Sequence, residues 1–280
     1  MTPLPGKRLG PFCFRHLRPG AGCSYLPQEW MYLTDRGVPM IRPNRRVMVF
    51  SAHAADFCSR AGGAILRFVD AGCDVQIHDL TYGEKCESPL LWNENPAITE
   101  DEVKEIRRNE IEAAAAVLGA PISCLDYEDS PLLVGPERRG EILELIRAFR
   151  PDLVLCHWKN DFLHPDHVEA ANAVIWASRY CFRPGIKTDH PPCPAPEIVC
   201  YEPIAGIGPV VGYVPNLYVD VFAVWDRKVE AMRALATQPE LPEKYGIIAA
   251  YRALEAQITA NMKETTMAEA FVRLGTEAAP

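Results

Sequence analysis

Short apolar runs that alternate with longer helical segments constrain the fold of this chain more than any other feature. The first run is VMVFS at 47–51, and an uninterrupted run of this length is typical of a strand buried on both faces of a parallel sheet. Similar runs lie at 74–80, 122–125, 152–156, 198–201 and 217–221, and segments of helical periodicity lie at 60–71, 99–118, 137–149, 165–180, 225–236 and 243–262. The alternation predicts a Rossmann-like three-layer α/β sandwich around a mostly parallel sheet, with ligands bound beyond the carboxyl ends of the strands.

The segment 99–118 has the clearest helix boundaries. Thr99 is followed three residues later by Glu102, the spacing of a capping box, and Gly119 follows the last periodic residue, as is typical of a helix C-cap. The stretch 183–196 contains five prolines and predicts a long surface loop with the length to cover the ligand-binding edge of the sheet.

Composition and length indicate an ordinary folded protein with one catalytic domain. The chain has 280 residues, of which 48% are hydrophobic and 24% charged, and no linker divides the region after Arg46. We therefore expect a single domain over 46–280. Residues 1–45, rich in proline, glycine and arginine, are expected to form an N-terminal extension, an arm outside the core.

Charge and cysteine usage limit the partners and the compartment. The net charge of −8 argues against nucleic acid and anionic membrane surfaces, so we expect a small anionic substrate held by locally placed cations. The sequence contains neither an apolar run of membrane-spanning length nor an apolar signal segment. Ten scattered cysteines without a CxxC pair favour a reducing cytoplasm. We also expect a homo-oligomer.

Histidine and aspartate residues follow two of the predicted strands. His53 and Asp56 come directly after the first strand, and HPDH, from His164 to His167, begins the helix after the fourth strand. Alone, His53 and Asp56 are more often a turn histidine and a helix N-cap. Because parallel strands end at one edge of the sheet, the two motifs together predict a catalytic metal site with three protein ligands and an open position.

A third cluster of polar residues follows the second predicted strand. The loop TYGEKCES at 81–88 offers two carboxylates and a lysine for acid–base work and anion binding, although a solvated charge pair is equally typical of such a loop. In the helix 99–118, Arg107 and Glu110 are three residues apart, a spacing that favours an ion pair on the helix surface.

Taken together, these motifs resemble the LmbE-like or PIG-L-like zinc deacetylases, whose motifs are AHPDD and HxDH. The resemblance covers about residues 46–260 and includes Thr81-x-Gly83-Glu84, Arg107-x-x-Glu110, Leu118-Gly119 and the segment from Val219 to Lys228. It implies an LmbE-like fold and one Zn²⁺ per chain, with His53, Asp56 and His167 as ligands. By the same resemblance His164 contacts the reacting oxygen.

One departure from the family pattern changes the expected reaction. The first aspartate of AHPDD, the general base of the deacetylases, is Ala55 in this chain. Loss of a general base typically costs about 10²–10⁴-fold in rate, so conventional amide hydrolysis at this site should be crippled. The segment 51–63, with Gly83-Glu84-x-x-Glu87-Ser88 and Leu91-Trp92, is similar to the bacterial 4-oxalomesaconate hydratase branch of gallate degradation.

That branch implies a zinc-containing lyase of aromatic-compound catabolism that hydrates the C=C bond of an oxo-tricarboxylic acid to give 4-carboxy-4-hydroxy-2-oxoadipate. Glu84 or Glu87 could then supply the acid–base group that is missing at Ala55, and His164 could bind the developing oxyanion. A tricarboxylate also requires cations, and the candidates near the active edge are Arg60, Lys85, Arg107 and Lys159.

Two other functions stay open at this point. An N-deacetylase acting on an N-acetyl sugar conjugate could use Asp161 or Asp166 as its base, and the HPDH motif favours it. A catalytically silent metal- or ligand-binding protein is suggested by Ala55 itself.

Overall fold

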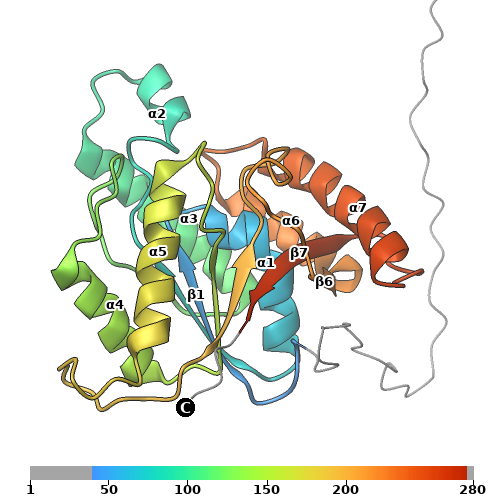
Figure 1. Cartoon of the computed structure of the whole chain (residues 1–280). Coiled ribbons are helices and arrows are strands. Elements are labelled where there is room, and N and C mark those ends of the chain that lie inside the picture. Colours follow the sequence, from blue (N-terminus) through green and yellow to red (C-terminus); the bar gives the residue numbers. More distant parts are fainter. Residues whose placement is uncertain (1–39, 276–280) are drawn as a thin grey trace, which may run out of the picture. The chain divides into compact units, whose positions relative to one another are not determined.

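The computed structural model describes residues 40–275, which form a seven-stranded sheet with helices on both faces (Figure 1). The strands follow the order β3-β2-β1-β4-β5-β7-β6. Strands β1 to β5 are parallel, whereas β7 runs antiparallel to β5 and β6. Their bounds are β1 (Arg46–Ser51), β2 (Asp74–Asp79), β3 (Ile122–Cys124), β4 (Leu153–His157), β5 (Glu197–Tyr201), β6 (Leu217–Asp220) and β7 (Ala268–Leu274). The predicted α/β fold is confirmed.

The helices form two layers. Helices α1, α3, α6 and α7 belong to one layer, and α4 and α5 pack together on the opposite face of the sheet (Figure 1). Their bounds are α1 (Asp56–Asp70), α2 (Pro89–Glu94), α3 (Glu100–Leu118), α4 (Pro136–Phe149), α5 (Pro165–Tyr180), α6 (Trp225–Ala234) and α7 (Leu241–Thr259), with a 3-10 turn η1 (Phe222–Val224) before α6. No helix in this part of the chain is long and apolar enough to cross a membrane.

Helix α3 has the ends that its sequence predicts. The Thr99 hydroxyl accepts a hydrogen bond from the Glu102 backbone N–H at 3.2 Å, and the Glu102 carboxylate accepts one from the Thr99 N–H at 2.8 Å. Gly119 at the C-cap has φ 76°, a left-handed conformation that glycine adopts without steric cost.

The central strands β1 and β4 are buried. In β1, Met48 and Phe50 pack in one apolar cluster with Ile142 and Ile146 of α4 and Val174 of α5. Strands β1 and β4 are neighbours in the sheet, but the helices that follow them, α1 and α5, lie on opposite faces. The carboxyl ends of β1 and β4 therefore flank the topological switch point of the sheet. Side chains that follow β1 and β4 therefore meet at one place on a fixed platform.

Four features differ from the sequence-based predictions. Helix α2 and strand β7 were not predicted, and α1 begins at Asp56 rather than at residue 60. The loop 183–196 was expected to cover the ligand-binding edge, and this was wrong. It follows the carboxyl end of α5 and hydrogen-bonds Arg147 near the end of α4, through the Arg183 and Ile186 carbonyls, so it lies at the amino ends of the strands.

Most of the predicted arm, residues 1–39, lies outside the described residues. Of its last six residues, Met40 and Ile41 are buried, and the Arg45 guanidinium donates a hydrogen bond to the Met40 carbonyl at 2.7 Å. The described part of the chain thus contributes to the core from Met40 onward.

Candidate metal centre

The two predicted motifs meet at the carboxyl ends of β1 and β4. His53 and Asp56 lie on the turn from β1 into α1, where Asp56 is the first helical residue. His164 is the N-cap of α5, and Pro165 at the first helical position starts the turn that carries His167. His53, Asp56 and His167 are all buried.

Asp56 lies between the two histidines that the family resemblance assigns as ligands. Its Oδ2 is 3.3 Å from His53 Nδ1 and 3.4 Å from His167 Nε2. Ligand atoms about 2.0–2.1 Å from a tetrahedral ion are separated by about 3.3 Å, so these distances suit one divalent ion. Both ring nitrogens are buried and make no hydrogen bond within the described residues, which is the state expected of metal ligands. Among groups of side chains close enough to share one ion, His53 and His167 occur with Glu87 and His164, and Asp56 and His167 occur with His157, so the side chains gathered here fit a zinc ion.

Carboxylates contact the second ring nitrogen of each of these two imidazoles. His167 Nδ1 lies 2.8 Å from Asp161 Oδ2, which also accepts a hydrogen bond from the Ile204 backbone N–H at 3.0 Å. His53 Nε2 lies 3.4 Å from both Asp129 Oδ1 and Asp166 Oδ2. Such carboxylate–histidine pairs fix the tautomer, which leaves the other ring nitrogen free to bind a metal.

Sequence reasoning missed Asp129. Its Oδ2 accepts hydrogen bonds from the backbone N–H groups of Lys85 and Cys86, at 2.7 and 3.0 Å, and so ties the loop after β2 to the metal centre. Burial raises the pKa of Asp129, but the hydrogen bond with His53 outweighs it and lowers the pKa below its usual range. The loop between β3 and α4 carries no motif that could have indicated this role.

His157 at the end of β4 was also missed as a site residue. Its Nε2 accepts a hydrogen bond from the Ala52 backbone N–H at 2.9 Å and lies 3.3 Å from Asp56 Oδ2. Its ring stacks on His167 with 4.0 Å between centroids. Burial and the neighbouring His167 hold the pKa of His157 well below its usual range. A neutral His157 therefore fixes the β1–α1 turn.

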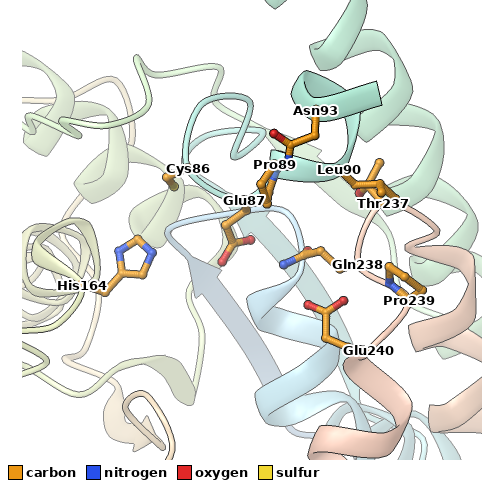
Figure 2. Close-up of a pocket in the computed structure, with 10 residues that line it drawn as sticks. All are labelled: Cys86, Glu87, Pro89, Leu90, Asn93, His164, Thr237, Gln238, Pro239 and Glu240. Carbon is orange, nitrogen blue, oxygen red and sulfur yellow. The ribbon is translucent and has the colours of Figure 1, made fainter. Parts of the chain in front are cut away.

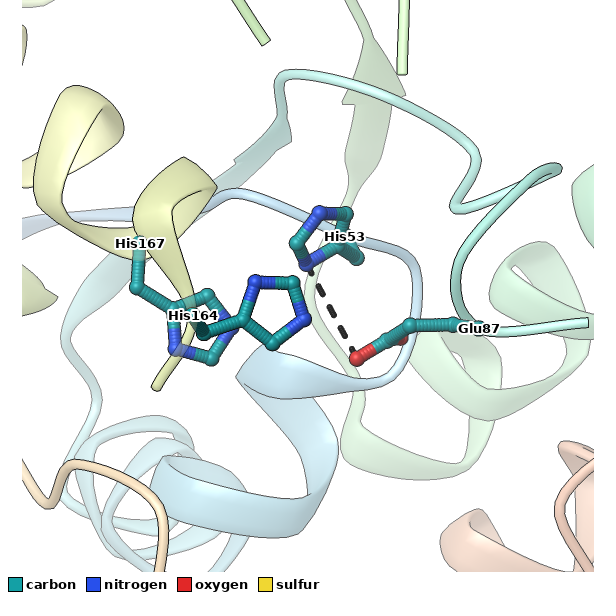
Figure 3. A group of neighbouring side chains, drawn as sticks. All are labelled: His53, Glu87, His164 and His167. Carbon is teal, nitrogen blue, oxygen red and sulfur yellow. Dashed lines mark ion pairs between the residues drawn. The ribbon is translucent and has the colours of Figure 1, made fainter. Parts of the chain in front are cut away.

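Glu87 reaches the centre from the loop after β2. Its Oε1 is 3.8 Å from His53 Nδ1, and Figure 3 shows its carboxylate pointing toward that ring. Gly83, with φ 66°, allows this approach, since a Cβ there would lie 3.3 Å from the Cβ of His53 and 3.1 Å from that of Glu87. The Glu87 N–H also donates to the Gly83 carbonyl at 3.1 Å.

Glu84 occupies a different environment from Glu87. Its side chain is buried, and its Oε1 lies 3.7 Å from Lys104 Nζ on α3. Glu87, in contrast, belongs to a group of side chains with His53, His164 and His167 whose ligand atoms all lie within 4.8 Å of one another. The structure thus brings one of the two candidate glutamates to the histidines.

The electrostatics of the centre suit a cation and a proton-transfer group. Burial lowers the pKa of His53, but the hydrogen bonds with Asp129 and Asp166 outweigh it and raise the pKa well above its usual range, so the carboxylates favour positive charge here. Burial and the nearby Asp56 raise the pKa of Glu87. Burial, with His167 and His53 close by, lowers the pKa of His164 to about 4.

The four cations predicted to bind substrate lie in different places. Arg60 is buried, and its Nε lies 2.9 Å from Asp56 Oδ1. Lys85 is near Glu100 and Glu128, at 3.7 and 3.9 Å. Lys159 is exposed, with its ammonium 6.0 Å from the centre of the Trp158 ring.

The fourth cation, Arg107, is fully buried in α3. It pairs with Glu110 at 2.7 Å, as predicted, but the pair lies inside the protein and not on the helix surface. Arg107 Nη2 also lies 3.8 Å from Glu87 Oε2.

A pocket of about 420 Å³ opens beside the centre (Figure 2). One wall is the start of α2, and the facing wall is the turn between α6 and α7. Glu87 and His164 also belong to its lining. The complete lining is Cys86, Glu87, Pro89, Leu90, Asn93, His164, Thr237, Gln238, Pro239 and Glu240.

Comparison with known proteins matches this arrangement to one family. Residues 48–178, which span both motifs, match the family described as PIG-L: GlcNAc-PI de-N-acetylase. A 4-oxalmesaconate hydratase of Pseudomonas putida is 33% identical over 222 residues, which are 78% of this chain and 83% of that protein. The chain belongs to the PIG-L/LmbE-like family. Its relatives are enzymes, and they include both hydratases and deacetylases.

A solved structure and a further relative show this range. The crystal structure of GalB, the 4-carboxy-2-hydroxymuconate hydratase from P. putida, has a TM-score of 0.78 and 29% identity, and the match covers 84% of this chain and 98% of GalB. A diacetylchitobiose deacetylase of Thermococcus kodakarensis is 28% identical over 69% of this chain and 70% of its own length. The matched region therefore supports the fold and the family. The choice between hydration and deacetylation has to come from the residues of the site.

Proposed function

We propose that this chain is a zinc-dependent hydro-lyase that adds water to the C=C bond of an unsaturated oxo-tricarboxylic acid of the 4-oxalomesaconate type, as part of aromatic-compound breakdown. The similarity to the P. putida hydratases supports this proposal. So does a metal-ligand set of His53, Asp56 and His167 beside a pocket that contains a glutamate and a histidine.

The observation that carries the proposal is where the acid–base carboxylate lies. The turn after β1 has Ala55, a buried methyl group that cannot take up a proton, where the deacetylase motif has its general base. Glu87 instead approaches the centre from the loop after β2. A carboxylate in this second position suits a reaction other than the amide hydrolysis of the family.

Hydration places a hydroxyl group on one carbon of the double bond and a proton on the other. When bound, zinc supplies a Lewis acid that polarises the carbonyl conjugated to that bond. Glu87, whose pKa is raised, is suited to move the proton between water and carbon. Neutral His164, its pKa about 4, donates a hydrogen bond to the oxygen on which negative charge develops.

Deacetylation is the second candidate, because family members at similar identity are deacetylases and the HPDH motif is intact. Its bases in this chain would be Asp161 or Asp166. Asp161 is engaged by His167 Nδ1 and the Ile204 N–H, and Asp166 by His53 and the Leu132 N–H at 3.0 Å. Both carboxylates thus lie behind the imidazoles, which favours hydration. A silent binding protein would not need Glu87 beside the ligands.

The test is a comparison of turnover by the zinc-loaded protein on two substrates. Loss of the enone absorbance of 4-oxalomesaconate measures hydration, and acetate release from an N-acetylglucosamine conjugate measures deacetylation. We expect hydration at ordinary enzymatic rates and no acetate release. Acetate release at ordinary turnover would overturn the proposal, and inactivity on both substrates would favour the silent binder.

Restoring the deacetylase base offers a second comparison. Ala55→Asp returns a carboxylate to the turn that carries two of the ligands, so weak amide hydrolysis should emerge without any gain in hydration. The same two assays measure both changes. A large gain in hydration would show that residue 55, and not Glu87, is the natural position of the acid–base group.

A further inference from the structure

The pocket beside the metal centre has an unusual lining for a polyanionic substrate. None of the described residues that line it is a lysine or an arginine. Two of them, Glu87 and Glu240, are glutamates. The buried guanidinium of Arg107 lies 3.8 Å from Glu87 Oε2 but does not line the pocket. A substrate carboxylate away from the metal must therefore be bound by neutral N–H or O–H donors.

Arg107 is already committed within the protein. Its Nη1 donates to Glu110 Oε2 at 2.7 Å and to the Thr237 hydroxyl, its Nε donates to the Tyr82 carbonyl at 3.3 Å, and its Nη2 donates to Gln238 Oε1 at 3.0 Å. The side chain is fully buried. Arg107 is thus unavailable as a direct ligand of the substrate.

The contact with Arg107 determines how the Gln238 amide is oriented. A guanidinium can only donate hydrogen bonds, so the amide oxygen must face Arg107 and the amide NH₂ must face away from it. Figure 2 shows this nitrogen pointing into the pocket. Gln238 therefore offers two N–H donors to a bound molecule on the wall opposite α2.

The turn that carries Gln238 is held in place by α3. Glu110 accepts hydrogen bonds from the Thr237 backbone N–H through Oε1 and from the Thr237 hydroxyl through Oε2, both at 2.8 Å. Glu110 and Thr237 are both buried. The donors of Gln238 are consequently preorganised, so binding does not have to order this wall.

We propose that Gln238 determines substrate specificity by binding a carboxylate of the substrate through its side-chain NH₂, with Arg107 as the positioning residue that orients the amide. The identity of the substrate as a tricarboxylate rests on the proposed function. Amide donors bind a carboxylate but offer nothing to an ammonium group. The pocket should therefore accept a carboxylate of the substrate at the Gln238 amide.

Gln238→Glu is the most informative variant. One carboxylate oxygen can still accept from Arg107, so the wall stays anchored, while the second oxygen replaces the donor and faces the substrate. Loss of a hydrogen bond to a charged group, together with like-charge repulsion, should weaken binding by about 10–100-fold. Asn172→Asp adds the same charge at an exposed position of α5 outside the pocket lining and serves as the charge-matched comparison.

The experiment is calorimetric titration of the zinc-loaded proteins with tricarballylate, a saturated tricarboxylate that cannot be hydrated. We expect Kd to rise by about 10–100-fold in Gln238→Glu and by less than about threefold in Asn172→Asp, with zinc content and Tm unchanged in both. In turnover assays, Gln238→Glu should raise KM with little change in kcat, and the comparison variant should change neither constant appreciably.

Equal weakening by the two variants, or tight binding by Gln238→Glu, would overturn the inference. So would a failure of the unchanged protein to bind tricarballylate. Because the titration needs no turnover, its outcome is independent of the reaction. An unchanged protein that binds tricarballylate through Gln238 but does not hydrate oxalomesaconate would refute the proposed function and leave the role of Gln238 standing.

Discussion

The carboxylate of Asp56 is contacted on both of its oxygens. Oδ2 lies within 3.4 Å of ring nitrogens of His53, His157 and His167, and Oδ1 accepts a hydrogen bond from Arg60 Nε at 2.9 Å. Burial raises the pKa of Asp56, but electrostatic attraction to His167 and to the Arg60 guanidinium outweighs it and holds the pKa well below its usual range. A carboxylate that stays ionised while buried is a suitable metal ligand.

Asp161 should affect zinc affinity without being a ligand. Asp161→Asn keeps the size of the side chain but removes the charge that orients His167 at 2.8 Å, so zinc affinity should fall by about 10–100-fold. Competition with a chromophoric chelator measures this change. Asp152→Asn, on the surface at the start of β4, is the matched control and should leave the affinity unchanged. Equal affinities in all three proteins would contradict the assigned role of Asp161.

Elements far apart in the sequence meet at a buried ion pair beside α1. Glu269 of β7 accepts hydrogen bonds from the backbone N–H groups of Gly63 and Ala64, at 2.7 and 2.8 Å, and from Lys228 Nζ of α6 at 2.7 Å. Lys228 also donates to the Ser59 carbonyl at 2.8 Å. The pair thus ties α6 and β7 to the helix that presents Asp56.

This ion pair also explains why β7 could not be predicted. Apolar runs indicated the other strands, whereas β7 contains Glu269, a charge that normally marks a solvent-exposed position. Its partner Lys228 is 41 residues away, and no local pattern shows that the two meet. Helix α2 escaped prediction because its six residues bury no side chain and carry no periodic signal.

Two adjacent glycines in α1 should respond oppositely to a methyl group. A Cβ at Gly63 would lie 2.5 Å from Val221 Cγ1 and 2.9 Å from Glu269 Oε1, so Gly63→Ala should lower the free energy of unfolding by about 1–3 kcal/mol. A Cβ at Gly62 would lie 3.5 Å from its nearest neighbour, an ordinary contact distance. Gly62→Ala should therefore raise the free energy of unfolding by up to about 1 kcal/mol through helix propensity.

Urea unfolding of the two alanine variants and the unchanged protein measures these differences. Equal effects at the two positions would show that the close approach of α1 to Val221 and Glu269 is not a constraint on the fold.

At the scale of the whole molecule, strand and helix patterns predicted where the site lies. The residues predicted to bind the metal follow β1 and β4, and the chain order of parallel strands is enough to place such residues at one edge. What could not be predicted depends on contacts between distant loops. Asp129 reaches His53 from a loop without a motif, and Gln238 acquires its role only through Arg107.

One pH dependence of global stability follows from burial of a histidine away from the centre. Burial lowers the pKa of His78 in β2 from 6.5 to about 4, so the unfolded chain binds a proton more readily than the folded one between these pH values. The contribution of neutral His78 is present above about pH 6.5 and is lost as the pH falls toward about 4, by roughly 3 kcal/mol in all.

His78→Gln removes this titration and serves as the comparison. Urea unfolding of both metal-free proteins between pH 7.5 and 4.5 should show that the stability of the unchanged protein falls more steeply with acidification. Parallel curves would mean that His78 titrates alike in the folded and unfolded chains.

The central claim is that Glu87 of the loop after β2 supplies the acid–base group that the β1–α1 turn lacks. The most direct measurement is kcat for 4-oxalomesaconate hydration in zinc-loaded Glu87→Gln, with Glu84→Gln as the matched variant from the same loop. Glutamine keeps the size and polarity of the side chain but cannot exchange a proton. Glu84→Gln should lower kcat far less, because the Glu84 carboxylate faces Lys104.

We expect Glu87→Gln to lower kcat by about 10²–10⁴-fold with one equivalent of zinc still bound. Normal turnover in Glu87→Gln, or an equal loss in both variants, would contradict the account.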